Sequence, residues 1–423
     1  MKKNITLISF IMMFWFVISF ITNILGPIIP DIIKNFSLSH LAMAGFIPTS
    51  FFLAYAIMSV PAGMLIDKIG DKKVLFIGFL MPFIGTLLFA CVPCYEMLLA
   101  SCFIIGLGMA MLQTVLNPLQ RVAGGEENYA FIAEFAQFMF GIASFISPLV
   151  YIYLVKELTP GTYKKGNNLL IDMLARVTPP ELPWVSLYWV FVALLLVMLV
   201  AVLFMRIPKV ELSEDEKAGS KSSYLELFEK KTVWLFFLGI FCYVSTEQAT
   251  ANFMTTFLEK YHHIDPQLEG ARTVSYFWGL MTVGCVVGMI LLKLYDCRKV
   301  LLGSGVLSAV FLLLALFGST TIAVVAFPAI GFCISVMYSI VFSLALNSVS
   351  KNHGSFAGIL CSGIVGGAGG PLIVSAIADA VGLRAGMLFI MVFILYITGI
   401  GIWAKPLIDN KTVRLRELFQ RSE

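Results

Sequence analysis

A polar stretch from Tyr243 to Thr256 interrupts an apolar segment that runs from about 233 to 258, and it carries Glu247 near its centre. A helix rises about 1.5 Å per residue, so Glu247 would lie about 20 Å along it, near the middle of a hydrocarbon core about 30 Å thick. A carboxylate at that depth costs about 2.5 kcal/mol or more to insert, and it usually faces a partner or a water-filled cavity. Glu247 is therefore the first candidate for binding or coupling chemistry.

Four more polar residues share one face of this helix, and Glu247 lies at the edge of that face. They recur at three- and four-residue spacing and are Ser245, Gln248, Asn252 and Thr255. A polar stripe facing lipid would be costly, so we expect it to line a central cavity. The alternative is hydrogen bonding between helices, which explains Ser245 more easily than a carboxylate at the midplane.

The composition is that of a polytopic membrane protein. Hydrophobic residues make up 59% of the 423 residues and charged residues 13%, whereas soluble domains have about 25% charged residues. Long unbroken apolar runs exclude a β-barrel, which would show short alternating segments. The sequence has no P-loop, metal-spaced cluster or nucleophile motif, so we expect neither an enzyme nor a bound cofactor. A membrane sensor or receptor, the non-transport alternative, would need a signalling domain that the polar segments are too short to form.

Hydropathy and loop-breaking residues predict an all-α protein with twelve transmembrane helices. It divides into an N-terminal six-helix half (1–206), a cytoplasmic linker (207–231), a C-terminal six-helix half (232–404) and a cytoplasmic tail (405–423). A short amphipathic helix is expected at 169–177. The predicted spans are 5–30, 42–66, 74–93, 97–119, 129–154, 184–206, 232–258, 271–294, 300–318, 321–348, 354–380 and 385–404.

The basic residues predict the orientation of the chain. With the N-terminus in the cytoplasm, 21 of the 29 Lys and Arg residues lie on the cytoplasmic side and eight on the other, as the positive-inside rule requires. An even number of spans returns the C-terminus to the same side. We therefore expect a multi-pass protein of the cell (inner) membrane, monomeric in the lipid bilayer, with both termini cytoplasmic and no nucleic-acid partner.

An internal repeat links the two predicted halves. The stretches Gly63 to Lys73 and Gly288 to Arg298 follow spans two and eight and align without gaps at an offset of 225 residues (288 minus 63). Parallel repeats of this kind occur in transporters, with the substrate site at their interface. Asp67 can accept hydrogen bonds or pair with a cation at a helix end, which would latch a cytoplasmic gate. The predicted gate residues are Asp67, Lys72, Asp296 and Arg298.

The first of these stretches resembles the loop signature of the major facilitator superfamily, through Gly63, Asp67, Gly70, Lys72 and Lys73. The span from Gly106 to Pro118 is similar to the fucose/galactose/glucose permease family of sugar:cation symporters within it. Three further stretches agree, namely Thr22 to Pro27, Gly331 to Leu344, and Gly366 to Pro371 leading to Asp379. The resemblance implies import of a hexose or deoxyhexose by alternating access, coupled to H⁺ or Na⁺.

The sequence departs from that family at its acidic positions. Asn23 and Gln113 stand where the resemblance places acids in helices one and four. Neither amide can titrate, although both can hydrogen-bond sugar hydroxyls. Coupling is therefore absent, as in a sugar uniporter, or depends on Glu247 or Glu134, with a possible Na⁺ site at Glu247. An exporter of another small amphipathic solute is a further alternative. The expected substrate-binding residues are Asn23, Gln113, Asn117, Gln137, Gln248, Asn252 and Tyr338.

Overall fold

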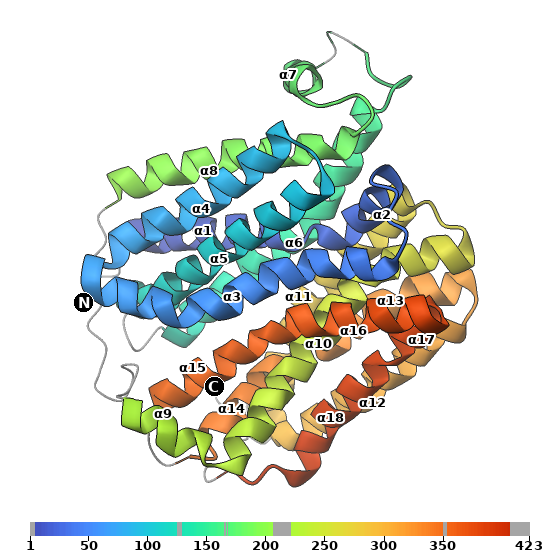
Figure 1. Ribbon diagram of the computed structural model, residues 1–423. Helices are drawn as coiled ribbons and strands as arrows, with labels where there is room; N and C mark the ends of the chain where they lie inside the picture. Colours follow the sequence, from blue (N-terminus) through green and yellow to red (C-terminus); the bar gives the residue numbers. More distant parts are fainter. Residues whose placement is uncertain are drawn as a thin grey trace, which may run out of the picture.

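The computed structural model describes residues 5–124, 129–164, 166, 168–205, 221–349 and 353–406. These residues form helices, without a strand among them (Figure 1). The helices are α1 (Ile5–Thr22), α2 (Leu25–Asn35), α3 (Leu41–Ile69), α4 (Asp71–Cys91), α5 (Tyr95–Gly124), α6 (Tyr129–Leu158), α7 (Leu169–Val177), η2 (Pro183–Val185), α8 (Ser186–Phe204), α9 (Lys221–Phe228), α10 (Lys231–His262), η3 (Pro266–Gly270), α11 (Ala271–Leu294), α12 (Cys297–Phe317), α13 (Thr320–Ile334), α14 (Met337–Leu346), α15 (His353–Ser362), η4 (Gly363–Val365), α16 (Gly366–Val381), α17 (Leu383–Leu388) and α18 (Ile390–Trp403).

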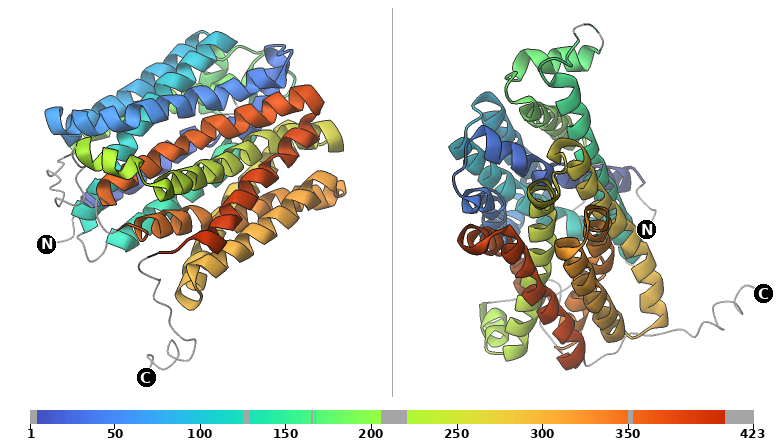
Figure 2. Two further views of the ribbon diagram at one scale, coloured as in Figure 1. Left: turned by 60° about the horizontal axis from the view of Figure 1, so that its bottom comes forward. Right: turned by 90° about the vertical axis from the view of Figure 1, so that its right-hand side faces the viewer.

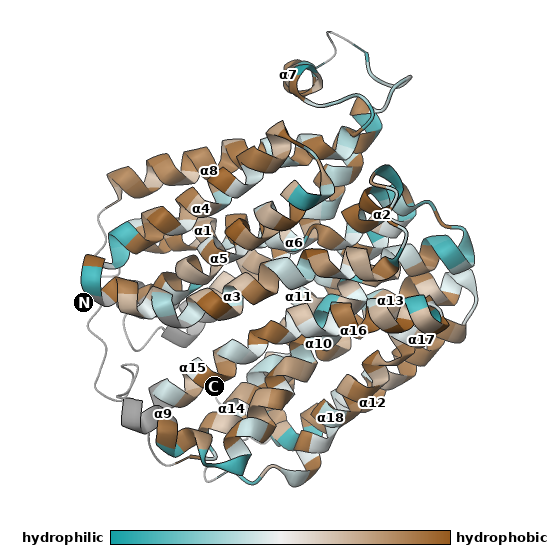
Figure 3. Cartoon of the chain, in the orientation of Figure 1, coloured by the Kyte–Doolittle hydropathy of each residue, from teal (hydrophilic) through white to brown (hydrophobic). Residues whose placement is uncertain are grey.

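Eleven segments within the described residues are long and apolar enough to cross a membrane. Helix α10 is not among them because the polar stretch around Glu247 lowers its hydropathy, but its 32 residues are long enough to cross and it packs inside the bundle. Figure 3 shows hydrophobic residues along the helices and hydrophilic ones mostly near their ends. The all-α membrane fold is confirmed, and α10 completes a set of twelve crossings.

The first crossing is broken where the sequence predicts a continuous helix. Helix α1 ends at Thr22 and α2 begins at Leu25, so Asn23 lies in the turn between them. Pro27 explains the break, because a proline cannot donate to the carbonyl group four residues earlier and its ring collides with that carbonyl, here Asn23. The crossing formed by α15 and α16 is likewise interrupted by the 3₁₀ turn η4, at Gly363.

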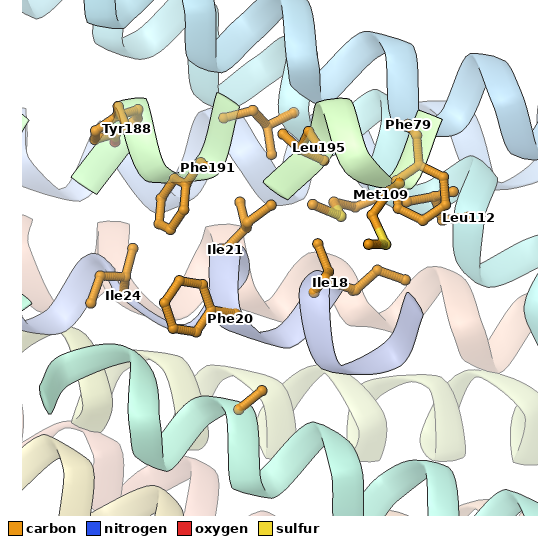
Figure 4. Packing of buried hydrophobic residues seen from close by; sticks show 14 of the residues in the cluster. Ile18, Phe20, Ile21, Ile24, Phe79, Met109, Leu112, Tyr188, Phe191 and Leu195 are labelled. Atoms are coloured by element: carbon orange, nitrogen blue, oxygen red, sulfur yellow. The ribbon is translucent and has the colours of Figure 1, made fainter. Parts of the chain in front are cut away.

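The helices form two bundles, each with its own apolar core. The first bundle comprises α1 to α8, and Figure 4 shows Ile18 and Ile21 of α1 packed near Met109, Phe191 and Leu195 in its core. The second bundle comprises α10 to α18 and buries Phe236 and Phe253 among other residues. Figure 2 shows the two bundles side by side with their helices running in a common direction. Helix α9 precedes the second bundle and lies within the segment expected to be a linker.

Two pairs of helices carry most of the contact between the bundles. Helix α3 packs along α16, and α6 packs along α11. Helix α2 also packs against α10. We call the end where α1 begins and α18 ends the terminal end, and the end where α2 finishes and α7 lies the opposite end (Figure 1). The interface between the bundles runs from one of these ends towards the other, and α10 meets the first bundle there through α2.

Candidate functional site

Glu247 lies in the middle of α10 and is partly buried. The Tyr243 hydroxyl donates to its Oε2 at 2.8 Å, and Gln248 Nε2 donates to its Oε1 at 2.9 Å. Both donors are neutral and belong to the same helix. In the described part of the chain Glu247 forms no ion pair with a Lys, Arg or His residue. A carboxylate in this setting has neutral donors and no fixed counter-charge, so it is free to bind a mobile cation.

Tyr243 and Tyr338, from α10 and α14, lie near this carboxylate. The rings of Tyr243 and Tyr338 lie 5.5 Å apart between centroids, with an interplanar angle of 54°. Tyr338 also interacts with Cys361 of α15, and Tyr55 of α3 approaches both from the first bundle. The Tyr55 hydroxyl is buried, and no group in the described part of the chain forms a hydrogen bond with it. Rings next to polar groups suit a sugar, because its apolar face packs on a ring while its hydroxyls find polar partners.

The rest of the polar stripe on α10 packs against helices. Ser245 Oγ donates to the Gly366 carbonyl oxygen of α16 at 2.9 Å. Thr255 packs next to Gly270, and Asn252 is 2% exposed beside Gly26 of α2. The expectation of a single cavity-lining face therefore needs correction in this conformation, because these side chains lie where helices meet. Among the described residues Asn252 Nδ2 has no hydrogen-bond partner, so this group is a donor that could bind a solute.

The predicted polar residues of the first bundle lie in different settings. Asn23 Nδ2 donates to Ser144 Oγ at 2.8 Å and to Ser19 Oγ at 3.4 Å, so this amide links α1 to α6. Gln113 of α5 is partly buried, and Gln137 of α6 is exposed. The side chains of Asn117 and Glu134 lie outside the described residues. The roles of these residues in binding stay predictions.

The predicted gate residues form contacts within their own bundles. Lys72 Nζ donates to the Leu203 carbonyl oxygen at 2.8 Å, near the end of α8. Asp296 Oδ2 pairs with Arg298 at 2.8 Å, and its Oδ1 accepts the Arg298 backbone N–H at the start of α12. The side chain of Asp67 lies outside the described residues. The gate role of these residues stays a prediction.

The cap at Asp296 gives a pH-dependent prediction. The hydrogen bond from Arg298 lowers the pKa of the Asp296 carboxyl group below its usual value. Its stabilising contribution is therefore present above the pKa of the unfolded chain and disappears as pH falls through the lower folded pKa. Replacement with alanine is expected to cost about 1 kcal/mol of stability near neutral pH. Thermal melting in detergent should show this difference shrinking on acidification. A difference that persists in strong acid would contradict the account, and Asp296→Asn, which keeps a capping oxygen, is the control.

The interface between the bundles is closed at the opposite end. A Cβ atom on Gly26 would overlap the Ala251 carbonyl oxygen, so α2 and α10 touch through their backbones. Thr49 Oγ1 donates to the Ala368 carbonyl oxygen at 3.0 Å, which joins α3 to α16. On the other side of the interface, Ser275 of α11 donates to the Phe145 carbonyl oxygen of α6. The two bundles therefore touch on both sides of this part of the interface.

The interface opens towards the terminal end. Ser275, Gly279 and Thr282 of α11 contact α6, at Phe145 and Gly141. The same face of α11 continues at Val286 and Met289, which are 44% and 39% exposed. On α6 the matching continuation is Gln137 and Phe138, both exposed. The two helices therefore separate beyond Gly141, and Glu247 lies in a molecule that is open at the terminal end.

Asp31 is a candidate functional residue that the sequence analysis missed. It lies in α2, is 6% exposed, and accepts hydrogen bonds from Tyr151 and Gln267. The predicted first span ended at residue 30, which placed Asp31 in solvent. The signal that could have identified it was an acid directly after Pro30 in an apolar run, Ile28 to Ile33.

Comparison with known proteins identifies the family. The model of the major facilitator superfamily matches residues 11–361. This chain belongs to the major facilitator superfamily. A glucose/galactose transporter of Brucella abortus is 29% identical over 397 residues, which cover 92% of this chain and 91% of that protein. A putative glucose/galactose transporter of Helicobacter pylori is 30% identical over 372 residues, which cover 86% of this chain and 87% of that protein. The crystal structure of the E. coli fucose:proton symporter matches with a TM-score of 0.68 and 20% identity, over 96% of this chain and all (100%) of that one.

Membership of the major facilitator superfamily accounts for the architecture. The chain is a multi-pass membrane protein of the transporter type, and the resemblance to the fucose/galactose/glucose permeases is confirmed. Major facilitators are built from two six-helix repeats with the substrate site between them. Tyr338, which lies beside Tyr243, interacts with Tyr55 of the first bundle, so these rings lie where the two bundles meet.

Proposed function

We propose that this protein imports a monosaccharide, a hexose or deoxyhexose, by alternating access and couples its movement to protons through Glu247. The observation that carries the proposal is the carboxylate of Glu247 in the middle of α10. It is partly buried, Tyr243 and Gln248 hold it by hydrogen bonds, and within the described residues it has no ion-pair partner. Such a group is costly to place in a membrane, and a protein that keeps one usually uses it in binding or proton transfer.

The choice of a sugar follows from the groups around the carboxylate. Tyr243 and Tyr338 offer ring faces, whereas Gln248 and Asn252 offer amides that can bind hydroxyl groups. Relatives that align with most of this chain carry the names of glucose/galactose transporters. We expect Asn23, Gln113, Asn117 and Gln137 to complete the site from the first bundle as it moves.

The groups that face Glu247 favour a proton over Na⁺ as its partner. Both neighbours, the Tyr243 hydroxyl and Gln248 Nε2, direct donors at the carboxylate. A Na⁺ site would need several oxygen atoms directed at the ion, because hard cations bind oxygen ligands. Protonation of the carboxylate requires no such set of oxygen ligands. The structure of a fucose:proton symporter matches this fold, which supports the same choice.

The distribution of basic residues supports an assignment of the two ends of the molecule to the two sides of the membrane. The segments expected on the same side as the N-terminus hold 21 of the 29 basic residues, so we place the terminal end in the cytoplasm and the opposite end outside the cell. This conformation of the protein is then closed outside and open inside. Residues 1–206 and 232–404 would rock as two halves of a monomer, with 207–231 and 405–423 on the cytoplasmic side of the inner membrane.

Uptake into proteoliposomes tests this function. Labelled glucose, galactose and fucose are each supplied with an inward proton gradient, an inward Na⁺ gradient or none. We expect at least one of these sugars to accumulate above equilibrium only with the proton gradient. Accumulation driven by Na⁺ alone would overturn the choice of ion, and equilibration without accumulation would indicate a uniporter. If none of the sugars crosses the membrane, the sugar assignment is wrong.

A further inference from the structure

Asp31 joins the two bundles at the opposite end of the molecule. Its Oδ2 accepts a hydrogen bond from the Tyr151 hydroxyl at 2.5 Å, and its Oδ1 accepts one from Gln267 Nε2 at 2.7 Å. Tyr151 belongs to α6 of the first bundle, whereas Gln267 belongs to η3 between α10 and α11 of the second. One buried carboxylate therefore fixes α2 to α6 and ties both to the other bundle.

The charged groups around Asp31 leave it without a close cation. Lys34, on the same helix, is the basic group that acts on it, while Asp265 before η3 and Glu259 of α10 are acids. In the described residues Asp31 takes part in no ion pair. Its two close partners are neutral donors, and hydrogen bonds to an ionised acceptor are roughly twice as strong as those between neutral groups. The link to Gln267 is therefore strongest when Asp31 is ionised.

A second carboxylate links the bundles at the same end and supplies a control. Asp379 of α16 accepts the backbone N–H groups of Leu41 at 2.7 Å and Ala42 at 2.8 Å, at the start of α3. A negative charge is favourable at a helix N-terminus. Asp379 is exposed, whereas Asp31 is buried. The two acids close the same end by separate contacts.

We propose that Asp31 is a proton-binding residue of the transport cycle, distinct from Glu247. Its ionised carboxylate holds the external end closed through Gln267, and its protonation from outside releases that contact. The inference rests on the proposed function, since it takes the opposite end to be external. Acidity outside the cell would then increase the time that the site spends open to the outside, before any sugar binds.

Thiol labelling of the closed interface tests the proposal. The Cα atom of Asn252 lies next to Gly26 across the interface, and its side chain is 2% exposed, so Asn252→Cys reports opening to a membrane-impermeant reagent added outside. Cys91 is exposed at the same end, and labelling of position 252 relative to Cys91 cancels the effect of pH on thiol chemistry. We expect labelling of the reporter protein to rise about tenfold on external acidification, which corresponds to about 1.4 kcal/mol.

We call the contact between Asp31 and Gln267 the latch. Two variants of the reporter protein separate its effect from that of other acids. With Asp31→Asn, labelling should be fast at both neutral and acidic pH. With Gln267→Ala it should also be fast at both, because the donor in the second bundle is gone although Asp31 remains. Asp379→Asn and Glu259→Gln should each keep a pH response, because neither carries the proposed latch.

The outcomes decide the inference independently of the sugar assignment. If Asp31→Asn keeps the pH response of the parent protein, or is labelled as slowly, Asp31 is not the latch. If that variant fails to reach the membrane, Gln267→Ala decides alone, and a preserved pH response there overturns the proposal. Labelling needs neither sugar nor a gradient. Failure of sugar uptake would therefore leave a positive labelling result standing, and the reverse also holds.

Discussion

Glu247→Gln is expected to abolish proton-driven accumulation of sugar while exchange of sugar across the membrane continues. Glutamine has nearly the same size and can still accept a hydrogen bond from Tyr243, which donates to Glu247 at 2.8 Å, but it cannot bind a proton. Each pH unit of gradient stores about 1.36 kcal/mol, enough for about tenfold accumulation. The variant should lose this factor, measured as the ratio of internal to external sugar in proteoliposomes.

The control for this prediction is Glu259→Gln, which makes the same chemical change on the same helix. Glu259 is exposed near the end of α10, away from the aromatic cluster, so accumulation should persist. Counterflow, in which unlabelled internal sugar drives uptake of labelled sugar without a gradient, should be retained by Glu247→Gln. Undiminished accumulation in Glu247→Gln would remove Glu247 from coupling, whereas loss of counterflow as well would assign it to sugar binding alone.

Gly26→Val is expected to block transport without unfolding the protein. At Gly26 even a Cβ atom would overlap the Ala251 carbonyl oxygen in the closed conformation. Overpacking of this kind costs up to about 3 kcal/mol, which corresponds to roughly a hundredfold shift against closure. The protein should remain in the conformation open to the outside, so uptake and counterflow should both fall by about that factor.

Two controls test this explanation. One is the yield of folded protein, and the other is the same substitution at a second glycine. Gly399→Val places the same side chain in α18. Apart from the adjacent residues and the backbone of the same helix, no described atom lies within 4 Å of the added Cβ position, so this variant should leave transport nearly unchanged. Gel filtration should show both variants as folded. In the Asn252→Cys reporter, Gly26→Val should increase labelling from outside. Normal transport by Gly26→Val would show that the bundles do not close through this contact.

The sequence was sufficient to predict the spans and the position of the central acid, because both depend on local composition. The span predicted at 271–294 agrees with α11 (Ala271–Leu294), and the helix predicted at 169–177 agrees with α7. The position of Glu247 in the middle of α10 follows from counting residues along one helix. The break at Asn23 could have been predicted from Pro27, but the apolar run on both sides indicated one continuous helix.

Contacts between distant parts of the chain could not be predicted in the same way. Asp31 and Gln267 are 236 positions apart, and they meet only because the bundles are closed at this end. Asn252 was expected in a cavity, but it is buried beside Gly26 because the same closure covers it. A polar face on a membrane helix indicates that its side chains need hydrogen-bonding partners. Whether those partners are water, a solute or another helix depends on the conformation.

The central claim, that Glu247 carries a proton across with each sugar, is tested most directly by measuring proton movement during sugar entry. Proteoliposomes in lightly buffered medium, without an imposed gradient, receive the sugar identified by uptake, and the external pH is followed. We predict a sugar-dependent rise in external pH with the unmodified protein and none with Glu247→Gln, although sugar still enters the vesicles. An equal rise with Glu247→Gln, or sugar entry without any pH change in the unmodified protein, would contradict the account.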